Sequence, residues 1–110
     1  MALDMSSFGG AIASGRKAKQ MSQKELAAKI IKEDGQPITP QYLNDIEHDR
    51  RSPSSDHMIR QFIKVLDIKE EGALYGLSGV LPERDQKLVR KATPEKVEAA
   101  YVAFRNALKG

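Results

Sequence analysis

The sequence contains no cysteine and no tryptophan, and it has only two histidines. Without cysteine there is no disulfide framework, no thiolate metal site and no cysteine nucleophile. The histidines, His48 and His57, lie nine residues apart, which does not favour a histidine metal site. We therefore expect neither a metal nor any other cofactor.

Long apolar runs are also missing. No stretch approaches the roughly 18 apolar residues that a membrane span needs. Near the N-terminus, Asp4 stands where a signal peptide would be basic, and Ser6, Ser7, Gly9 and Gly10 interrupt any apolar segment. We expect no signal peptide, no membrane partner and a cytoplasmic location.

The composition fits one small folded domain. The chain has 110 residues, of which 40% are hydrophobic and 30% are charged. Its formal net charge of +3 comes from 18 Lys and Arg against 15 Asp and Glu. This small excess, without a basic tail, does not identify a nucleic-acid binder. An argument for DNA binding must rest on where particular residues lie.

Apolar residues recur at helical spacing through most of the chain, and no stretch alternates strictly as a half-buried strand would. The spacing predicts an all-α chain with helices at residues 7–19, 23–33, 40–48, 55–66, 70–77, 82–92 and 94–108. Capping signals agree: Ser22 and Glu25 form a capping box, and the Thr-Pro pairs at 39–40 and 93–94 begin helices.

Several motifs follow one another in a fixed order. Residues 22–27 read Ser-Gln-Lys-Glu-Leu-Ala, residues 38–47 end in Ile-Glu, and residues 50–53 read Arg-Arg-Ser-Pro. Arg16 and a Phe-Gly-x-x-Ile segment at 8–12 precede them. Together these motifs resemble the Cro/phage-repressor (XRE-type) helix-turn-helix family.

The resemblance covers residues 8–77 and implies a lambda-repressor-like, five-helix DNA-binding domain over residues 1–78. Residues 79–110 would form a helical extension used for dimerisation or packing. The implied function is a sequence-specific transcriptional regulator, expected to be a repressor. Its partner would be double-stranded DNA, bound at a palindromic operator by a homodimer.

The helix at 40–48 has a polar face suited to reading bases. At about 100° per residue, its polar side chains gather opposite the apolar ones, and amide and carboxylate groups match base edges. With the N-cap added, the predicted base-reading residues are Thr39, Gln41, Asn44, Asp45 and His48. For this helix alone, a merely solvated face is the alternative, and Asp45 either tunes specificity or points away.

Phosphate contacts are expected at helix N-termini and in the loop after this helix. The candidates are Ser22, Gln23, Lys24, Arg50, Arg51, Ser54 and Ser55. By resemblance, Gln23 grips the DNA backbone and also braces the recognition helix. A solvated turn is the alternative for the two arginines. The resemblance further pairs Arg16 with Glu47 as a partly buried structural salt bridge.

The chain departs from the family pattern at two places. About six extra residues, within 31–38, separate the second and third helices, so either the second helix continues or the turn becomes a loop. Lys32 in that loop could contact the DNA backbone, although a tolerated surface insertion is the simpler reading. Asp49 stands where the family commonly has a glycine, and aspartate tolerates the left-handed conformation better than most residues.

An apolar stripe runs along one side of the last predicted helix. Its side chains recur every three or four residues, and the predicted dimer seam is Val97, Tyr101, Phe104 and Leu108. The stripe could instead pack on the preceding helices of the same chain, and both can hold.

A second reading of the protein is an antitoxin-like module that binds a protein partner, with DNA binding secondary. No catalytic triad, phosphate-binding glycine loop or metal-ligand cluster can be assembled, so we do not expect an enzyme.

Overall fold

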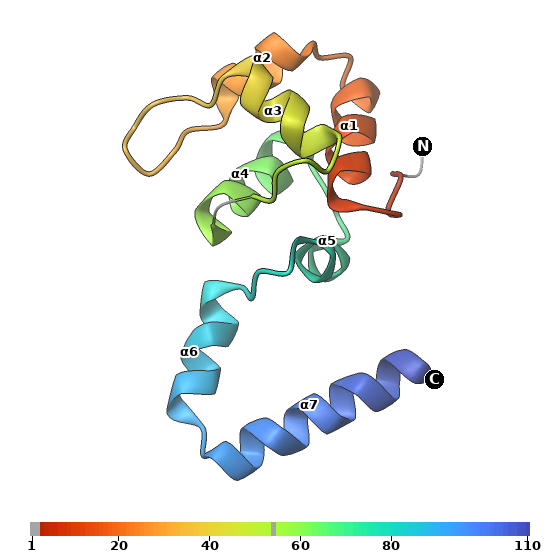
Figure 1. Ribbon diagram of the computed structural model, residues 1–110, viewed down its shortest axis with the longest axis vertical. Helices are drawn as coiled ribbons and strands as arrows, with labels where there is room; N and C mark the ends of the chain where they lie inside the picture. The colour runs from red at the N-terminus through yellow and green to blue at the C-terminus, as the bar shows by residue number, and fades with distance from the viewer. Residues whose placement is uncertain (1–2, 54) are drawn as a thin grey trace. The chain divides into compact units, whose positions relative to one another are not determined.

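The computed structural model describes residues 3–53 and 55–110, and this part of the chain forms seven helices. They fall into two compact units, Met1–Val80 and Leu81–Gly110, which are described separately (Figure 1). The first unit contains α1 (Phe8–Ala18), α2 (Gln23–Lys29), α3 (Pro40–Glu47), α4 (Asp56–Leu66) and α5 (Glu71–Ser78). The second contains α6 (Glu83–Lys91) and α7 (Pro94–Lys109). The predicted all-α fold class is confirmed.

The core of the first unit collects apolar side chains from all five of its helices. Phe8 of α1 and Phe62 of α4 meet edge to face, with ring centroids 6.2 Å apart, which is a favoured aromatic geometry. The fully buried large side chains are Ile12, Leu26, Ile30, Leu43, Ile46, Met58, Ile59, Phe62 and Leu74. Because α1 packs on α3, α4 and α5, and α2 packs on α3, the core fixes α3 from two sides.

The second predicted helix is too long. We expected residues 23–33, but α2 ends at Lys29, and Ile30 is extended with φ −102° and ψ 110°. From there the chain forms a small hairpin, called the insertion hairpin (residues 30–38) below. An isolated antiparallel bridge joins Ile31 to Pro37, and Gly35 turns the chain at φ +89°. The other six helices agree with prediction to within one residue at each end.

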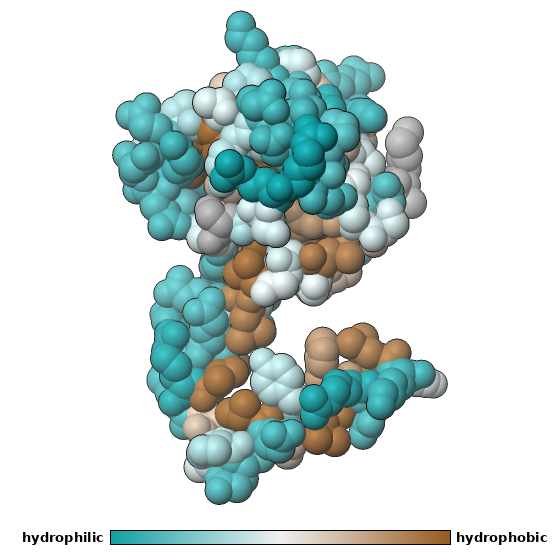
Figure 2. Space-filling model, viewed as in Figure 1, coloured by the Kyte–Doolittle hydropathy of each residue, from teal (hydrophilic) through white to brown (hydrophobic). Residues whose placement is uncertain are grey.

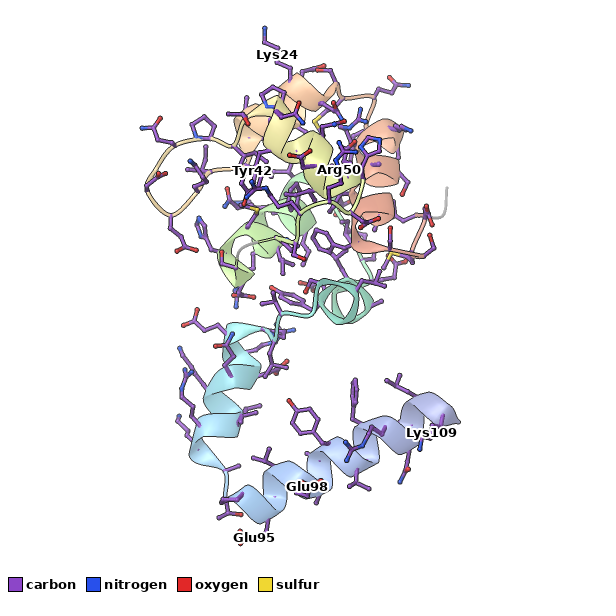
Figure 3. All side chains as sticks on the ribbon, viewed as in Figure 1. Lys24, Tyr42, Arg50, Glu95, Glu98 and Lys109 are labelled. Carbon is purple, nitrogen blue, oxygen red and sulfur yellow. The ribbon has the colours of Figure 1, made fainter. Side chains whose placement is uncertain are left out.

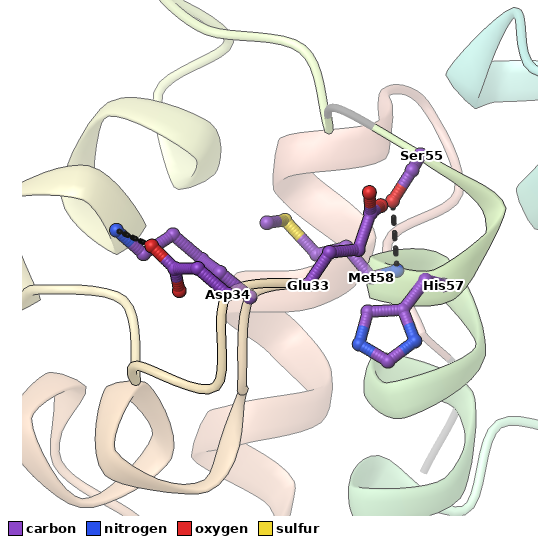
Figure 4. A pocket seen from close by; sticks show the side chains of 6 residues that line it. Glu33, Asp34, Ser55, His57 and Met58 are labelled. Atoms are coloured by element: carbon purple, nitrogen blue, oxygen red, sulfur yellow. Dashed lines mark hydrogen bonds and ion pairs between the residues drawn. The ribbon is translucent and has the colours of Figure 1, made fainter.

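A glutamine of α4 accounts for the early end of α2. The amide of Gln61 donates to the carbonyl of Ile31 at 2.6 Å, and its oxygen accepts from the Ile31 backbone N–H, also at 2.6 Å. His57 Nε2 lies 3.0 Å from the same carbonyl. These contacts satisfy backbone groups that a helix would otherwise have paired. Figure 4 shows the shallow hollow that the hairpin forms with α4, lined by Lys32, Glu33, Asp34, Ser55, His57 and Met58.

The second unit has no core of its own. Every residue of α6 and α7 lies in the described part of the chain, and none of them is buried. Figure 2 shows apolar side chains along both helices. The exposed large hydrophobic residues of these helices include Leu88, Val89, Tyr101, Phe104 and Leu108. Helix α7 begins as predicted, because the Thr93 hydroxyl accepts from the Lys96 backbone N–H.

Candidate nucleic-acid interface

Helix α3 presents one buried side and one polar side. Its buried residues are Leu43, Ile46 and Glu47, while Gln41 and His48 are exposed. The hydroxyl of Thr39 caps the helix by accepting from the Tyr42 backbone N–H at 3.1 Å. Asn44 and Asp45 are half-buried on the polar side. Four of the residues predicted to read bases, Gln41, Asn44, Asp45 and His48, therefore lie on one face of a short helix, and Thr39 caps its start.

Gln23, the first residue of α2, connects the two helices. Its amide nitrogen donates to Asn44 Oδ1 at 3.1 Å and to Glu47 Oε1 at 2.9 Å. The Asn44 oxygen accepts one bond in this way, so its second lone pair and the amide nitrogen can serve a ligand. The same bonds hold the N-terminus of α2 against the second half of α3.

Arg16 of α1 and Glu47 of α3 form a bidentate ion pair. Arg16 Nε lies 2.7 Å from Glu47 Oε2, and Arg16 Nη2 donates to Oε1 at 3.0 Å. The side chains are 13% and 3% exposed, and a third donor of the guanidinium binds the Met21 carbonyl at 2.9 Å. Its hydrogen bond with Glu47 raises the pKa of Arg16 above its ordinary value. This arrangement ties α1 to the end of α3 and leaves both groups engaged within the protein.

Asp45 is held by two donors from its own neighbourhood. Its Oδ1 accepts from Gln41 Nε2 at 3.0 Å and from Arg50 Nε at 3.2 Å, and Arg50 Nη2 also lies 3.2 Å away. The carboxylate charge is therefore balanced by an arginine within the protein. In turn, Asp45 holds Gln41 and Arg50 in fixed directions at the surface, which is a preorganised arrangement of polar groups.

Basic side chains flank this face. Lys24 on α2 is exposed and points away from the domain, and Arg50 lies beside α3 (Figure 3). The guanidinium of Arg51 stacks on the Tyr42 ring, 4.3 Å from its centroid. Such a cation–π contact holds an exposed arginine in one place at modest energetic gain. The loop after α3 thus carries two oriented positive charges.

The N-termini of the helices differ in how readily they could bind an anion, because they are capped differently. At α2, Ser22 Oγ accepts from the Glu25 backbone N–H, and the Glu25 carboxylate accepts from the Ser22 N–H, both at 3.0 Å. The backbone bond to Ser22 lowers the pKa of Glu25, and the Ser22 hydroxyl adds to the effect. This carboxylate competes with a phosphate at the same end. Ser55 caps α4 through the Met58 N–H, while Ser54 lies outside the described residues.

Three contacts of this region were not predicted from the sequence: the stack of Arg51 on Tyr42, the clamp of Gln61 on Ile31, and a bond from the Gly9 N–H to Asp49. Each joins residues that are far apart in sequence or lie in a loop, where periodicity gives no signal. The predicted seam residues lie on α7, in the second unit, with Val97 half-buried and the others exposed.

Residues 3–53 and 55–110 contain no group of three or more His, Cys, Asp or Glu that could hold a metal ion. None of the helices there combines the length and the apolar character needed to cross a membrane.

Comparison with known proteins gives one match. The model of a helix-turn-helix family aligns with residues 12–70, which is more than half of the chain and runs from within α1 to the residue before α5. No match was found among curated proteins or among solved structures. The matched segment contains α2, the insertion hairpin, α3 and the basic loop.

Proposed function

Because the chain belongs to the XRE/Cro-type helix-turn-helix family of DNA-binding regulators, we propose that it is a transcriptional repressor that recognises a palindromic operator as a homodimer. The observation that carries this proposal is the bracing of α3. Gln23 holds Asn44 from one side, and Asp45 holds Gln41 and Arg50 on the other. A solvated face has no need of such bracing, whereas a base-reading face gains from it because less side-chain entropy is lost on binding.

The polar side of α3 would enter the major groove, whose width admits an α-helix. Gln41 and Asn44 carry amides that pair with adenine edges, and Thr39 and His48 offer further hydrogen-bonding groups at the two ends of the helix. For Asp45 we propose a double task. It orients its two donors in the free protein, and it accepts from a cytosine amino group where the operator places one.

The phosphate contacts would come from both sides of α3. Lys24 lies at the start of α2, and Arg50 and Arg51 lie in the loop after α3, so their charges can reach the two edges of a groove. We include Gln23 and Ser55, whose backbone amides lie at or beside helix starts, and Ser22 through its hydroxyl, because Glu25 already occupies the Ser22 backbone N–H. These contacts set position and affinity, while the bases set sequence preference.

The size of the reading helix supports the proposed homodimer. Helix α3 has only eight residues, so one copy contacts few base pairs. Two copies related by a two-fold axis read two half-sites spaced by about 34 Å or a multiple of it. The predicted seam residues on α7 supply an apolar surface for the pairing. We propose a cytoplasmic location and no catalytic activity for this regulator.

The exposed apolar residues of α6 and α7 also favour a second candidate function. An antitoxin-like protein would use this surface to cover a protein partner, and its DNA binding would be secondary. A chain truncated after Ser78 separates the two. A repressor loses cooperative operator binding on truncation, whereas an antitoxin loses its protein partner and keeps half-site affinity.

The experiment is a fluorescence-anisotropy titration of the full chain against DNA from upstream of its own gene, beside a scrambled duplex, at several salt concentrations. We expect the native fragment to bind at least about 10³-fold more tightly. Equal, weak and strongly salt-dependent binding to both duplexes would indicate phosphate attraction alone. No binding to either at low salt would overturn the proposal.

Two variants sharpen this measurement. Gln41→Ala removes a group proposed to read bases, so it should cost about 1–3 kcal/mol on the native fragment and little on the scrambled one. Lys24→Ala removes a proposed phosphate contact, so it should weaken both and reduce the slope of log K against log salt by about 1. If both variants behaved alike, the assignment of their roles would be wrong.

A further inference from the structure

Helix α7 carries a narrow apolar seam. Val97, Tyr101, Phe104 and Leu108 follow one another at intervals of four, three and four residues. This is the spacing of the core positions of a two-stranded coiled coil over two heptads. Tyr101, Phe104 and Leu108 are 47%, 58% and 72% exposed. A seam of this regularity, left open to water, is typical of a surface that another helix covers.

The charges along α7 are unequally distributed between its two ends. Glu95 and Glu98 lie in the first half, where Lys96 is the one basic residue, and Arg105 and Lys109 lie in the second half (Figure 3). Glu98 and Arg105 are one heptad apart, on the same flank of the seam, and their side chains meet at 3.5 Å within the helix. The acidic end of one such helix is therefore complementary to the basic end of another that runs in the opposite direction.

We propose that α7 pairs antiparallel with α7 of a second copy of this chain. The inference rests on the proposed homodimer and adds its direction and register. In this register Val97 lies opposite Leu108 of the second copy, and Tyr101 lies opposite Phe104. Glu98 then lies opposite Arg105, and by symmetry this ion pair forms twice.

The opposite flank of the seam agrees with this arrangement. Its positions are Ala100 and Ala107, whose small side chains let two helices approach closely. In a parallel pair, Glu98 would face Thr93 and Arg105 would face Ala100, so neither charge would meet an opposite charge on the other helix. The charge pattern therefore selects the antiparallel direction. Leu88 and Val89 on α6, 67% and 39% exposed, enlarge the apolar surface that this unit can bury.

The test is sedimentation equilibrium of the full chain without DNA, using charge reversal. Glu98→Arg or Arg105→Glu alone converts both interhelical ion pairs into repulsions and should weaken self-association by about tenfold. The double variant, and an equimolar mixture of the two single variants, should restore it. Lys96→Glu, on the face away from the seam, serves as the matched control and should change little. A parallel pair would show neither the loss nor the rescue.

A distance measurement tests the direction independently. Because the chain has no cysteine, Glu95→Cys provides a single attachment point for a spin label. In the antiparallel register the two labels are separated by about 22 Å along the axis, at 1.5 Å per residue, whereas in a parallel pair they lie at the same level on the axis. A label distance without the axial separation would overturn the proposal.

The outcomes also separate this inference from the proposed function. A chain that stays monomeric at its highest soluble concentration, while still binding a half-site specifically, would overturn the α7 pairing and leave DNA recognition intact. A charge-dependent dimer that binds no DNA would support the pairing and overturn the proposed function.

Discussion

The backbone N–H of Gly9 donates to the carboxylate of Asp49 at 2.8 Å. This bond joins the first turn of α1 to Asp49, which lies two residues after the end of α3 and forty positions after Gly9. Asp49 adopts φ 58°, so it performs the left-handed turn for which the family commonly uses glycine, as we expected. Its carboxylate adds a cap, with favourable negative charge, at a helix start where no acidic residue lies in the first turn.

Gly9→Ala should destabilise the protein by about 3 kcal/mol. A Cβ at this position would lie 2.3 Å from the Ile46 carbonyl oxygen and 2.6 Å from that of Glu47, so α1 and α3 would have to separate. Gly76→Ala in α5 is the matched control, because no atom lies within 4 Å of its Cβ position. We expect it to raise stability by about 0.5 kcal/mol. Urea denaturation measures both, and equal effects would refute the close approach.

Glu47→Ala should lower stability by about 3 kcal/mol, because it strands the half-buried Arg16 guanidinium and a donor of Gln23. DNA affinity should fall only as far as the folded fraction falls. Thermal denaturation and anisotropy at a temperature where the variant is folded would check both. Unchanged stability with lost binding would place Glu47 in the DNA interface instead.

Asp45→Ala should reduce discrimination between operator and scrambled DNA while raising affinity for both at low salt. The variant releases Gln41 and Arg50 from their common acceptor, and it removes one negative charge from the proposed DNA-binding face. Anisotropy with the two duplexes at two salt concentrations separates the effects. Discrimination equal to that of the wild type would exclude an orienting role.

Gln61→Ala should loosen the insertion hairpin without unfolding the domain. The variant removes both side-chain bonds to the Ile31 backbone, so amide hydrogen exchange across residues 31–37 should accelerate. Lys64→Ala, at an exposed position on the same helix, is the control. Protection unchanged by the first substitution would mean that the bridge of Ile31 to Pro37 holds the hairpin alone.

The capping box of α2 should make a pH-dependent contribution to stability. Its hydrogen bonds with Ser22 lower the pKa of Glu25 below the ordinary value of 4.5, so folding favours the ionised carboxylate. The contribution is full above that ordinary value and is lost as the pH falls through the lowered pKa of the folded state. Relative to Glu25→Gln, the wild type should lose stability as the pH falls from above 4.5 through the lowered pKa of the folded state. Parallel curves for the two proteins would contradict this.

Much of the fold follows from local rules. The capping residues Ser22, Thr39 and Thr93 mark helix starts because each pairs with an amide only three residues away. The end of α2 did not follow, because Ile30 and Ile31 continue the helical spacing, and the group that holds Ile31 extended lies thirty residues later. Tertiary hydrogen bonding overrides local pattern there.

The candidate site divides in the same way. That Gln41, Asn44 and His48 share a face is a matter of helical periodicity alone, and sequence predicts it. Sequence left the direction of Asp45 open, because its acceptor bonds depend on where the loop carries Arg50. The arginine next to it stacks on Tyr42, which depends on the same loop path.

The unpacked character of α6 and α7 has a consequence for the lifetime of the protein. These helices have nine and sixteen residues, and they bury no side chain anywhere in their described length. They therefore have few contacts that oppose local unfolding. A protease should therefore cleave within Leu81–Gly110 first and leave the cored unit intact. Any partner that covers α7 would slow that cleavage, so surplus unassembled chains would be degraded faster than assembled ones.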